Sequence, residues 1–100
     1  MSVVRALCLL ALLPVTAVKA HDLGQDEALR LRQQGVIVPL NALTIDAIGR
    51  HPGSALLEVE LEEDGGRYTY EIEVVLPSGL VRELEYDAVS GKLLVDKEDD

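Results

Sequence analysis

Residues 56–64, LLEVELEED, and residues 67–75, RYTYEIEVV, decide the fold. In the first stretch aliphatic residues alternate with acids, with Leu57, Val59 and Leu61 on one side and Glu58, Glu60 and Glu62 on the other. In the second, Tyr68, Tyr70, Ile72 and Val74 alternate with Thr69, Glu71 and Glu73. A period of two residues is typical of a β-strand with one buried and one wet face. The stretches therefore predict two antiparallel strands that turn at Asp64-Gly65-Gly66.

The same period continues toward the C-terminus. In residues 80–86, LVRELEY, the side chains of Leu80, Leu84 and Tyr86 fall on one face with Arg82 between them, and those of Val81, Glu83 and Glu85 fall on the other. Residues 92–96, KLLVD, add a short final strand, and the acidic tail at 98–100 is expected to fray. Turns at Pro77-Ser78-Gly79 and Ser90-Gly91 separate these segments. The prediction is a three- or four-stranded antiparallel meander.

Two helices are predicted before the first strand. Asp26 is expected to cap a short helix that ends before Gly35, a residue suited to the C′ position. A second helix begins near Pro39, has an apolar stripe at Leu40, Leu43, Ala47 and Ile48, and ends at His51-Pro52-Gly53. Helices followed by strands indicate an α+β domain in which two N-terminal helices pack on the apolar face of the meander.

The N-terminal residues 1–20 have the features of a secretory signal peptide. Arg5 precedes an apolar run, and Val18-Lys19-Ala20 places small residues at the −3 and −1 positions of a cleavage site after Ala20. The chain's single cysteine, Cys8, lies in this segment, so the expected mature chain has no thiol. These features predict a periplasmic protein with no membrane span in its mature form, a flexible lead-in at 21–25 and one domain at 26–97.

The charge balance is strongly acidic. The chain has 18 acidic and 9 basic residues, and loss of Arg5 and Lys19 with the signal would leave a net charge of about −11. Such a field repels the phosphates of nucleic acids and anionic lipids. It favours basic protein segments or cations as partners.

The C-terminal hairpin resembles a known family. Residues 86–93, YDAVSGKL, match the closing signature of PepSY domains, and residues 28–43, ALRLRQQGVIVPLNAL, are similar to the leader of small secreted PepSY proteins. The resemblance covers roughly residues 26–97. Within the hairpin, Asp87 is suited to accept hydrogen bonds from the amides of its own turn, and Gly91 is suited to a positive φ.

The resemblance implies a non-enzymatic protein that regulates another protein. PepSY domains occur in the propeptides of secreted metallopeptidases and are named for a proposed inhibition of peptidases, so the expected partner is a separate peptidase or the sensor part of a signalling protein. No catalytic residues and no cofactor are implied. We expect a monomer or a weak homo-oligomer.

The candidate binding surface is the outward face of the sheet. It is expected to gather seven glutamates, namely Glu58, Glu60, Glu62, Glu71, Glu73, Glu83 and Glu85. Three readings of it stay open: a solvated face that prevents edge-to-edge aggregation, a docking surface for a basic segment, and a cation-responsive surface. A sheet edge can also accept an extended peptide as an added strand. A metal site shared by His21 and His51 is a further alternative.

Overall fold

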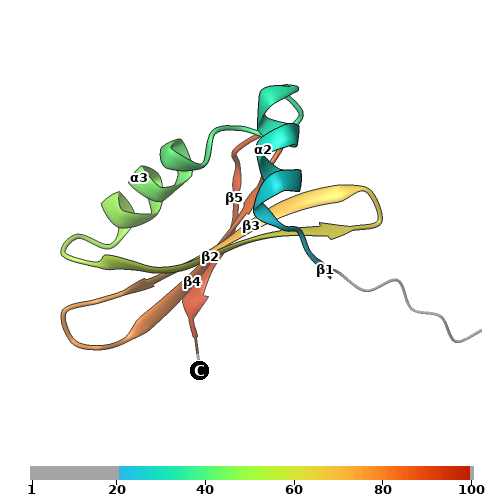
Figure 1. The fold of residues 1–100 in the computed structure, drawn as a ribbon. Coiled ribbons are helices and arrows are strands. Elements are labelled where there is room, and N and C mark those ends of the chain that lie inside the picture. Colours follow the sequence, from blue (N-terminus) through green and yellow to red (C-terminus); the bar gives the residue numbers. More distant parts are fainter. Residues whose placement is uncertain (1–20, 100) are drawn as a thin grey trace, which may run out of the picture.

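The computed structural model describes residues 21–99, so the predicted signal peptide and Asp100 lie outside the described part of the chain. Along the chain the elements are β1 (His21–Asp22), α2 (Gln25–Gln33), α3 (Leu40–Arg50), β2 (Ala55–Asp64), β3 (Arg67–Val75), β4 (Val81–Asp87) and β5 (Leu93–Glu98). Both helices precede the long strands, and both lie on the same side of the sheet (Figure 1). The predicted α+β architecture is confirmed.

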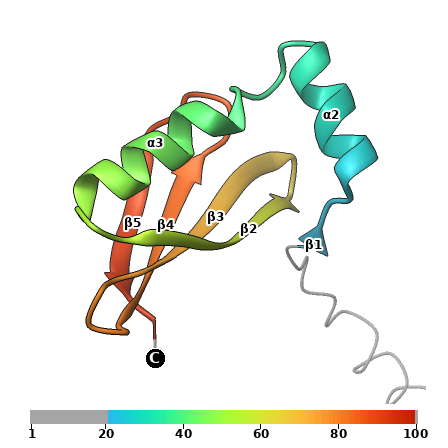
Figure 2. The same ribbon diagram turned by 60° about the vertical axis from the view of Figure 1, so that its left-hand side comes forward.

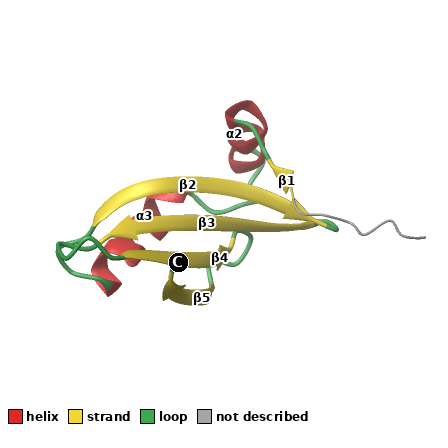
Figure 3. Ribbon diagram, turned by 90° about the horizontal axis from the view of Figure 1, so that it is seen from below, coloured by secondary structure: helices red, strands yellow, loops and turns green. Residues whose placement is uncertain are grey.

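The sheet is antiparallel throughout, with the strand order β1-β2-β3-β4-β5 (Figure 3). Strands β2 to β5 form the predicted meander. The sequence did not indicate β1, whose His21 pairs with Glu63 and whose Asp22 pairs with Glu62. Residues 21–25, expected to be a loose lead-in, thus contain a short edge strand and the first residue of α2.

The core lies between the sheet and the two helices (Figure 2). The sheet contributes Tyr70, Ile72, Val74, Leu84 and Tyr86, each at most 1% exposed. Helix α3 buries Leu43 and Ala47 against them, and α2 buries Ala28 and Leu31. The apolar stripe of α3 therefore covers the sheet as its spacing predicts.

Two buried tyrosines fasten the helices to the sheet through their hydroxyls. The hydroxyl of Tyr86 donates to Asp46 Oδ2 at 2.6 Å, and Arg50 Nε donates to the same oxygen at 2.7 Å. On the other helix, Arg32 Nη1 donates to the Tyr70 hydroxyl at 3.0 Å. The hydrogen bonds from Arg50 and Tyr86 lower the pKa of Asp46. Each hydroxyl thereby finds a partner at the rim of an otherwise apolar core.

The structure corrects two details of the helix and strand boundaries. Helix α2 starts at Gln25, with Gly24 rather than Asp26 at its N-cap and without a side-chain cap. Leu57 was predicted on the buried face, but a β-bulge between Leu56 and Glu58 leaves Leu57 unpaired and 55% exposed. A bulge inserts one residue into a strand and so breaks the alternation that the prediction assumed.

The last strand pair also differs from the prediction. Leu80 precedes β4 and is 48% exposed, because it belongs to the turn and not to the strand. The predicted frayed tail is partly paired instead, since β5 continues to Glu98 and the Asp99 amide donates to the Val81 carbonyl at 2.9 Å.

We predict that Tyr86→Phe lowers the free energy of unfolding by about 1–2 kcal/mol, because it removes a buried hydrogen bond to a charged carboxylate. Urea unfolding followed by circular dichroism measures this change. Tyr68→Phe is the matched control, since Tyr68 packs against the same core but forms no side-chain hydrogen bond within residues 21–99. Equal effects of the two substitutions would show that the hydroxyl of Tyr86 contributes nothing.

Candidate functional site

The strand register places glutamate opposite glutamate on the outward side of the sheet. In one row Glu58 pairs with Glu73, which pairs with Glu83; in the next, Glu60 pairs with Glu71, which pairs with Glu85. Glu62 lies beyond the second row, opposite Thr69. These seven glutamates are here called the acidic face. Like charges directly opposite each other on neighbouring strands are destabilising.

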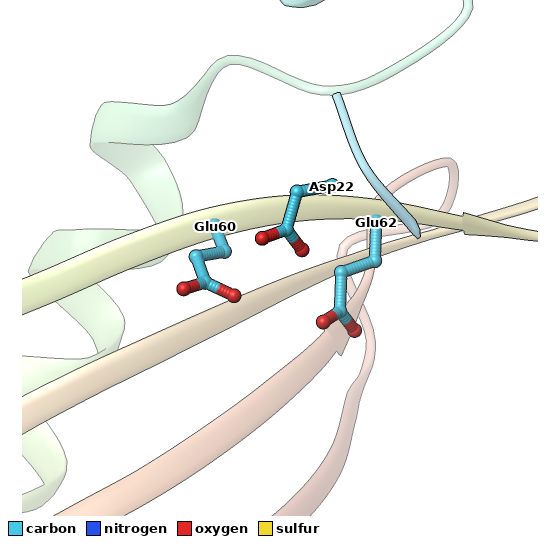
Figure 4. A group of neighbouring side chains, drawn as sticks. All are labelled: Asp22, Glu60 and Glu62. Carbon is cyan, nitrogen blue, oxygen red and sulfur yellow. The ribbon is translucent and has the colours of Figure 1, made fainter. Parts of the chain in front are cut away.

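Three groups of carboxylates bring their oxygens within 4.8 Å of one another. They are Asp22 with Glu60 and Glu62, Glu62 with Glu71 and Glu85, and Glu71 with Glu73 and Glu83. Figure 4 shows the first group, in which Asp22 comes from β1 and the two glutamates from β2. Sequence reasoning missed Asp22, because nothing in its sequence context signals that β1 joins the sheet edge.

Burial, hydrogen bonding and neighbouring carboxyls raise the pKa of several acidic groups on this face. Burial, followed by the charges of Glu83 and Glu62, raises the pKa of Glu71 to about 7. A hydrogen bond with Asp99, followed by burial, raises the pKa of Glu73 to about 7. Burial and nearby carboxylates also raise the pKa of Glu60 and Glu62. The centre of the acidic face thus holds carboxyls that are difficult to ionise.

Few cations offset this charge within the described residues. Lys97 Nζ lies 4.0 Å from Glu83 Oε2, at the limit of an ion pair. Arg82 lies toward the helix side, as its position in the alternation predicts, and binds Asp96 on β5 through Nη2 at 2.9 Å. Arg82, the neighbour of Glu83 in sequence, therefore pairs with Asp96 on the helix side of the sheet and does not neutralise the glutamates on the outward side.

His51 contacts Asp96 as well. At the C-terminal end of α3, His51 Nε2 lies 2.8 Å from Asp96 Oδ2. Burial alone would raise the pKa of Asp96, but hydrogen bonds with His51 and Arg82 outweigh it and lower that pKa. The hydroxyl of Ser54, the serine nearest to His51 in sequence, is buried without a hydrogen-bond partner in the described chain. The histidine and aspartate are therefore not linked to this serine in a nucleophilic relay.

The structure does not bring together His21 and His51, the alternative metal pair that the sequence offers. His21 pairs with Glu63 near the end of β2, whereas His51 precedes the start of β2 at Ala55. A strand rises about 3.3 Å per residue, so the two histidines are on the order of 25 Å apart. Their separation by nearly the full length of β2 prevents a shared ion.

The hairpin between β4 and β5 is built by Asp87 and Gly91. Asp87 Oδ1 accepts hydrogen bonds from the amides of Val89 at 2.8 Å and Ser90 at 3.0 Å, which lower the pKa of Asp87. Gly91 has a φ of 80°, in the region that favours glycine. These contacts lie within the turn, so both residues have a structural role.

A comparison with protein families identifies this arrangement of helix, meander and hairpin. The family model for the PepSY domain, described as peptidase propeptide and YPEB domain, matches residues 45–95. The chain belongs to the PepSY family. No curated protein and no solved structure matches it. The PepSY match begins within α3 and ends within β5, so β1 and α2 lie outside it. Within residues 21–99, neither helix has the length and apolar character that crossing a membrane requires.

The raised pKa values predict that stability falls as pH rises. Glu71 and Glu73 bind protons more readily in the folded protein than in the unfolded chain, so they favour folding below about pH 4.5. This contribution is lost as pH rises from about 4.5 through about 7. Glu71→Gln should therefore stabilise the protein by about 0.5–1 kcal/mol at pH 8 and by nearly nothing at pH 4.

Urea unfolding of the native protein and the variant at both pH values measures this difference. Glu98→Gln is the control, because Glu98 is exposed at the end of β5 and lies outside the acidic face. A gain at pH 8 that is the same for both substitutions would assign the effect to net charge and not to the crowding at Glu71.

Proposed function

We propose that this PepSY protein is a non-enzymatic, periplasmic binding protein that docks a basic segment of a partner and modulates that partner. The observation that carries the proposal is the pair of rows in which glutamates lie directly opposite one another. A partner that brings lysines or arginines to these rows would relieve their mutual repulsion. Repulsion between opposed glutamates destabilises the free protein, and its relief on binding would add to the binding free energy.

The family description supports the class of partner. The PepSY domain is described as a peptidase propeptide domain, and propeptides act by binding the peptidase. The partner that fits best is a secreted peptidase, and the next is the sensor part of a signalling protein. Secretion agrees with the signal-like residues 1–20, which lie outside the described chain.

The chemistry of the described residues supports a binding role over catalysis. The His51 ring is held by Asp96, and the hydroxyl of Ser54, the serine closest to His51 in sequence, has no hydrogen-bond partner in the described chain. The carboxyls of the acidic face lie on an open sheet surface at intermediate or greater exposure. An enclosed cleft with a nucleophile and an oriented base, which hydrolysis requires, is not formed by these groups.

Binding of a fluorescein-labelled peptide of alternating lysine and leucine tests the proposal by fluorescence anisotropy. Replacing Glu58, Glu60, Glu71 and Glu73 with glutamine should weaken binding at least tenfold, because each substitution removes one charge from the docking rows. The matched control replaces four acids outside these rows, Asp26, Glu27, Asp64 and Glu98, and should change affinity less than twofold. Equal losses of affinity in both variants would show that the peptide responds only to the net charge of the protein, which would contradict the proposal.

A cation-responsive role for the acidic face is the second candidate function. It is favoured by the three clusters of three carboxylates, in each of which the oxygens lie within 4.8 Å of one another. Calcium takes six to eight oxygen ligands, so carboxylates at this spacing suit it better than softer metals. Calorimetric titration of the protein with calcium should then give a saturable heat that Glu71→Gln abolishes. Absence of heat at millimolar calcium would eliminate the cation-responsive role. It would not bear on the proposal that the acidic face binds a basic protein segment.

A further inference from the structure

A cleft separates α2 from the helix-facing side of the sheet, away from the acidic face. Its volume is about 380 Å³, within the range of small ligand pockets. Its apolar walls come from Leu23, from Leu29 on α2, from Leu40 at the start of α3, and from Val59 and Leu61 on β2. Figure 2 shows α2 and α3 standing apart over the sheet. Leu29 remains 49% exposed, so this wall is open to an incoming apolar group.

Two charged residues line this largely apolar cleft, Arg32 as a cation and Asp26 as an acid. Arg32 Nη1 donates to the hydroxyl of Tyr70, which also lines the cleft, at 3.0 Å. Within residues 21–99, Arg32 forms no ion pair, whereas Arg30, Arg50 and Arg82 each pair with a carboxylate. In a chain with twice as many acids as bases, a half-buried arginine without an acidic partner is notable. A guanidinium with free donors in an apolar setting suits a carboxylate ligand.

The wall of the cleft formed by β2 is also an open sheet edge. Strand β1 covers this edge only at Glu62 and Glu63, and the Leu23 amide donates to the Leu61 carbonyl at 2.8 Å. The Leu61 carbonyl therefore points outward, and the backbone groups of Val59, two residues earlier, point to the same edge. Among the described residues 21–99, no strand pairs with residues 55–60 of β2 on their outer side. A polypeptide lying at the cleft can continue along this edge.

From these three features we infer that the cleft binds the C-terminal residue of a polypeptide that ends in an aliphatic side chain. Ala28 and Leu29 lie four and three residues before Arg32 on α2, so all three present neighbouring side chains to the cleft. A terminal residue presents an aliphatic side chain and a carboxylate from the same Cα atom. Its side chain would fill the apolar part, and its carboxylate would bind Arg32.

This site is distinct from the acidic face. The cleft lies on the helix side of the sheet, and α2, which forms one wall, lies outside the residues that the PepSY model matches. The two sites also differ in charge, because the acidic face gathers carboxyls, whereas the cleft places the guanidinium of Arg32 beside the single carboxyl of Asp26. Loss of basic-peptide binding and loss of C-terminus binding are therefore separable outcomes.

The test uses a fluorescein-labelled hexapeptide, uncharged apart from its end, that terminates in leucine with a free carboxylate. Anisotropy titrations compare it with the same peptide as a C-terminal amide and with a peptide that ends in serine. The amide and the serine peptide should each bind at least tenfold more weakly, since one lacks the charge and the other the aliphatic group. Arg32→Gln and Leu29→Asp should cause similar losses for the leucine peptide.

Arg30→Gln is the matched control, because Arg30 lies on the same helix, carries the same charge and pairs with Glu27 outside the cleft. It should change the affinity less than twofold. Equal binding of the acid and the amide, or an unchanged affinity of Arg32→Gln, would overturn the inference. Binding of decanoate without binding of the leucine peptide would also overturn it, because the occupant would then be a lipid-like acid.

Discussion

The register of the three central strands governs this molecule. It places Ile72 opposite Leu84 and Tyr70 opposite Tyr86 on one side of the sheet, and Glu71 opposite Glu85 and Glu73 opposite Glu83 on the other. One set of backbone hydrogen bonds thus creates both the apolar core and the row of opposed carboxylates. A slip by one residue would bring the glutamates under the helices, so the core fixes the arrangement of the acidic face.

The helices stabilise this two-sided sheet at defined points. Helix α3 buries Leu43 and Ala47, and it also holds the Tyr86 hydroxyl through Asp46. At its C-terminal end His51 reaches Asp96 on β5, which Arg82 binds from β4. These contacts join the helix to the strands that carry the glutamates. Contacts on the helix side of the sheet therefore offset the repulsion between glutamates on the outward side. They hold the strands, and with them the carboxylates, in a fixed arrangement that a partner can bind.

Much of the fold could be predicted from the sequence because the alternation of residues 58–62 and 67–75 leaves little freedom of register. The departures have local causes. The bulge at Leu57 and the turn position of Leu80 depend on backbone geometry that a two-residue period does not encode. The pairing of β1 depends on a two-residue contact with the sheet edge, a signal too short to recognise in a sequence.

The sequence predicted which glutamates share the outward face of the sheet, but it did not predict how they pair across strands. Which glutamates lie opposite one another, and the addition of Asp22, follow from register and topology. The cleft beside α2 was not predictable, because it joins residues from α2, α3 and two strands. Its one arginine, Arg32, differs from its neighbour Arg30 only through tertiary contacts.

The central claim is that burial, the hydrogen bond between Glu73 and Asp99, and the neighbouring glutamates keep the carboxyls of Glu71 and Glu73 partly protonated until a basic partner arrives. Titration of the glutamate carboxyl carbons by nuclear magnetic resonance, with and without the lysine-leucine peptide, measures this directly. In the free protein the carboxyls of Glu71 and Glu73 should titrate near pH 7, and the peptide should lower both midpoints. Midpoints near 4.5 in the free protein, or midpoints that the peptide leaves unchanged, would contradict the account.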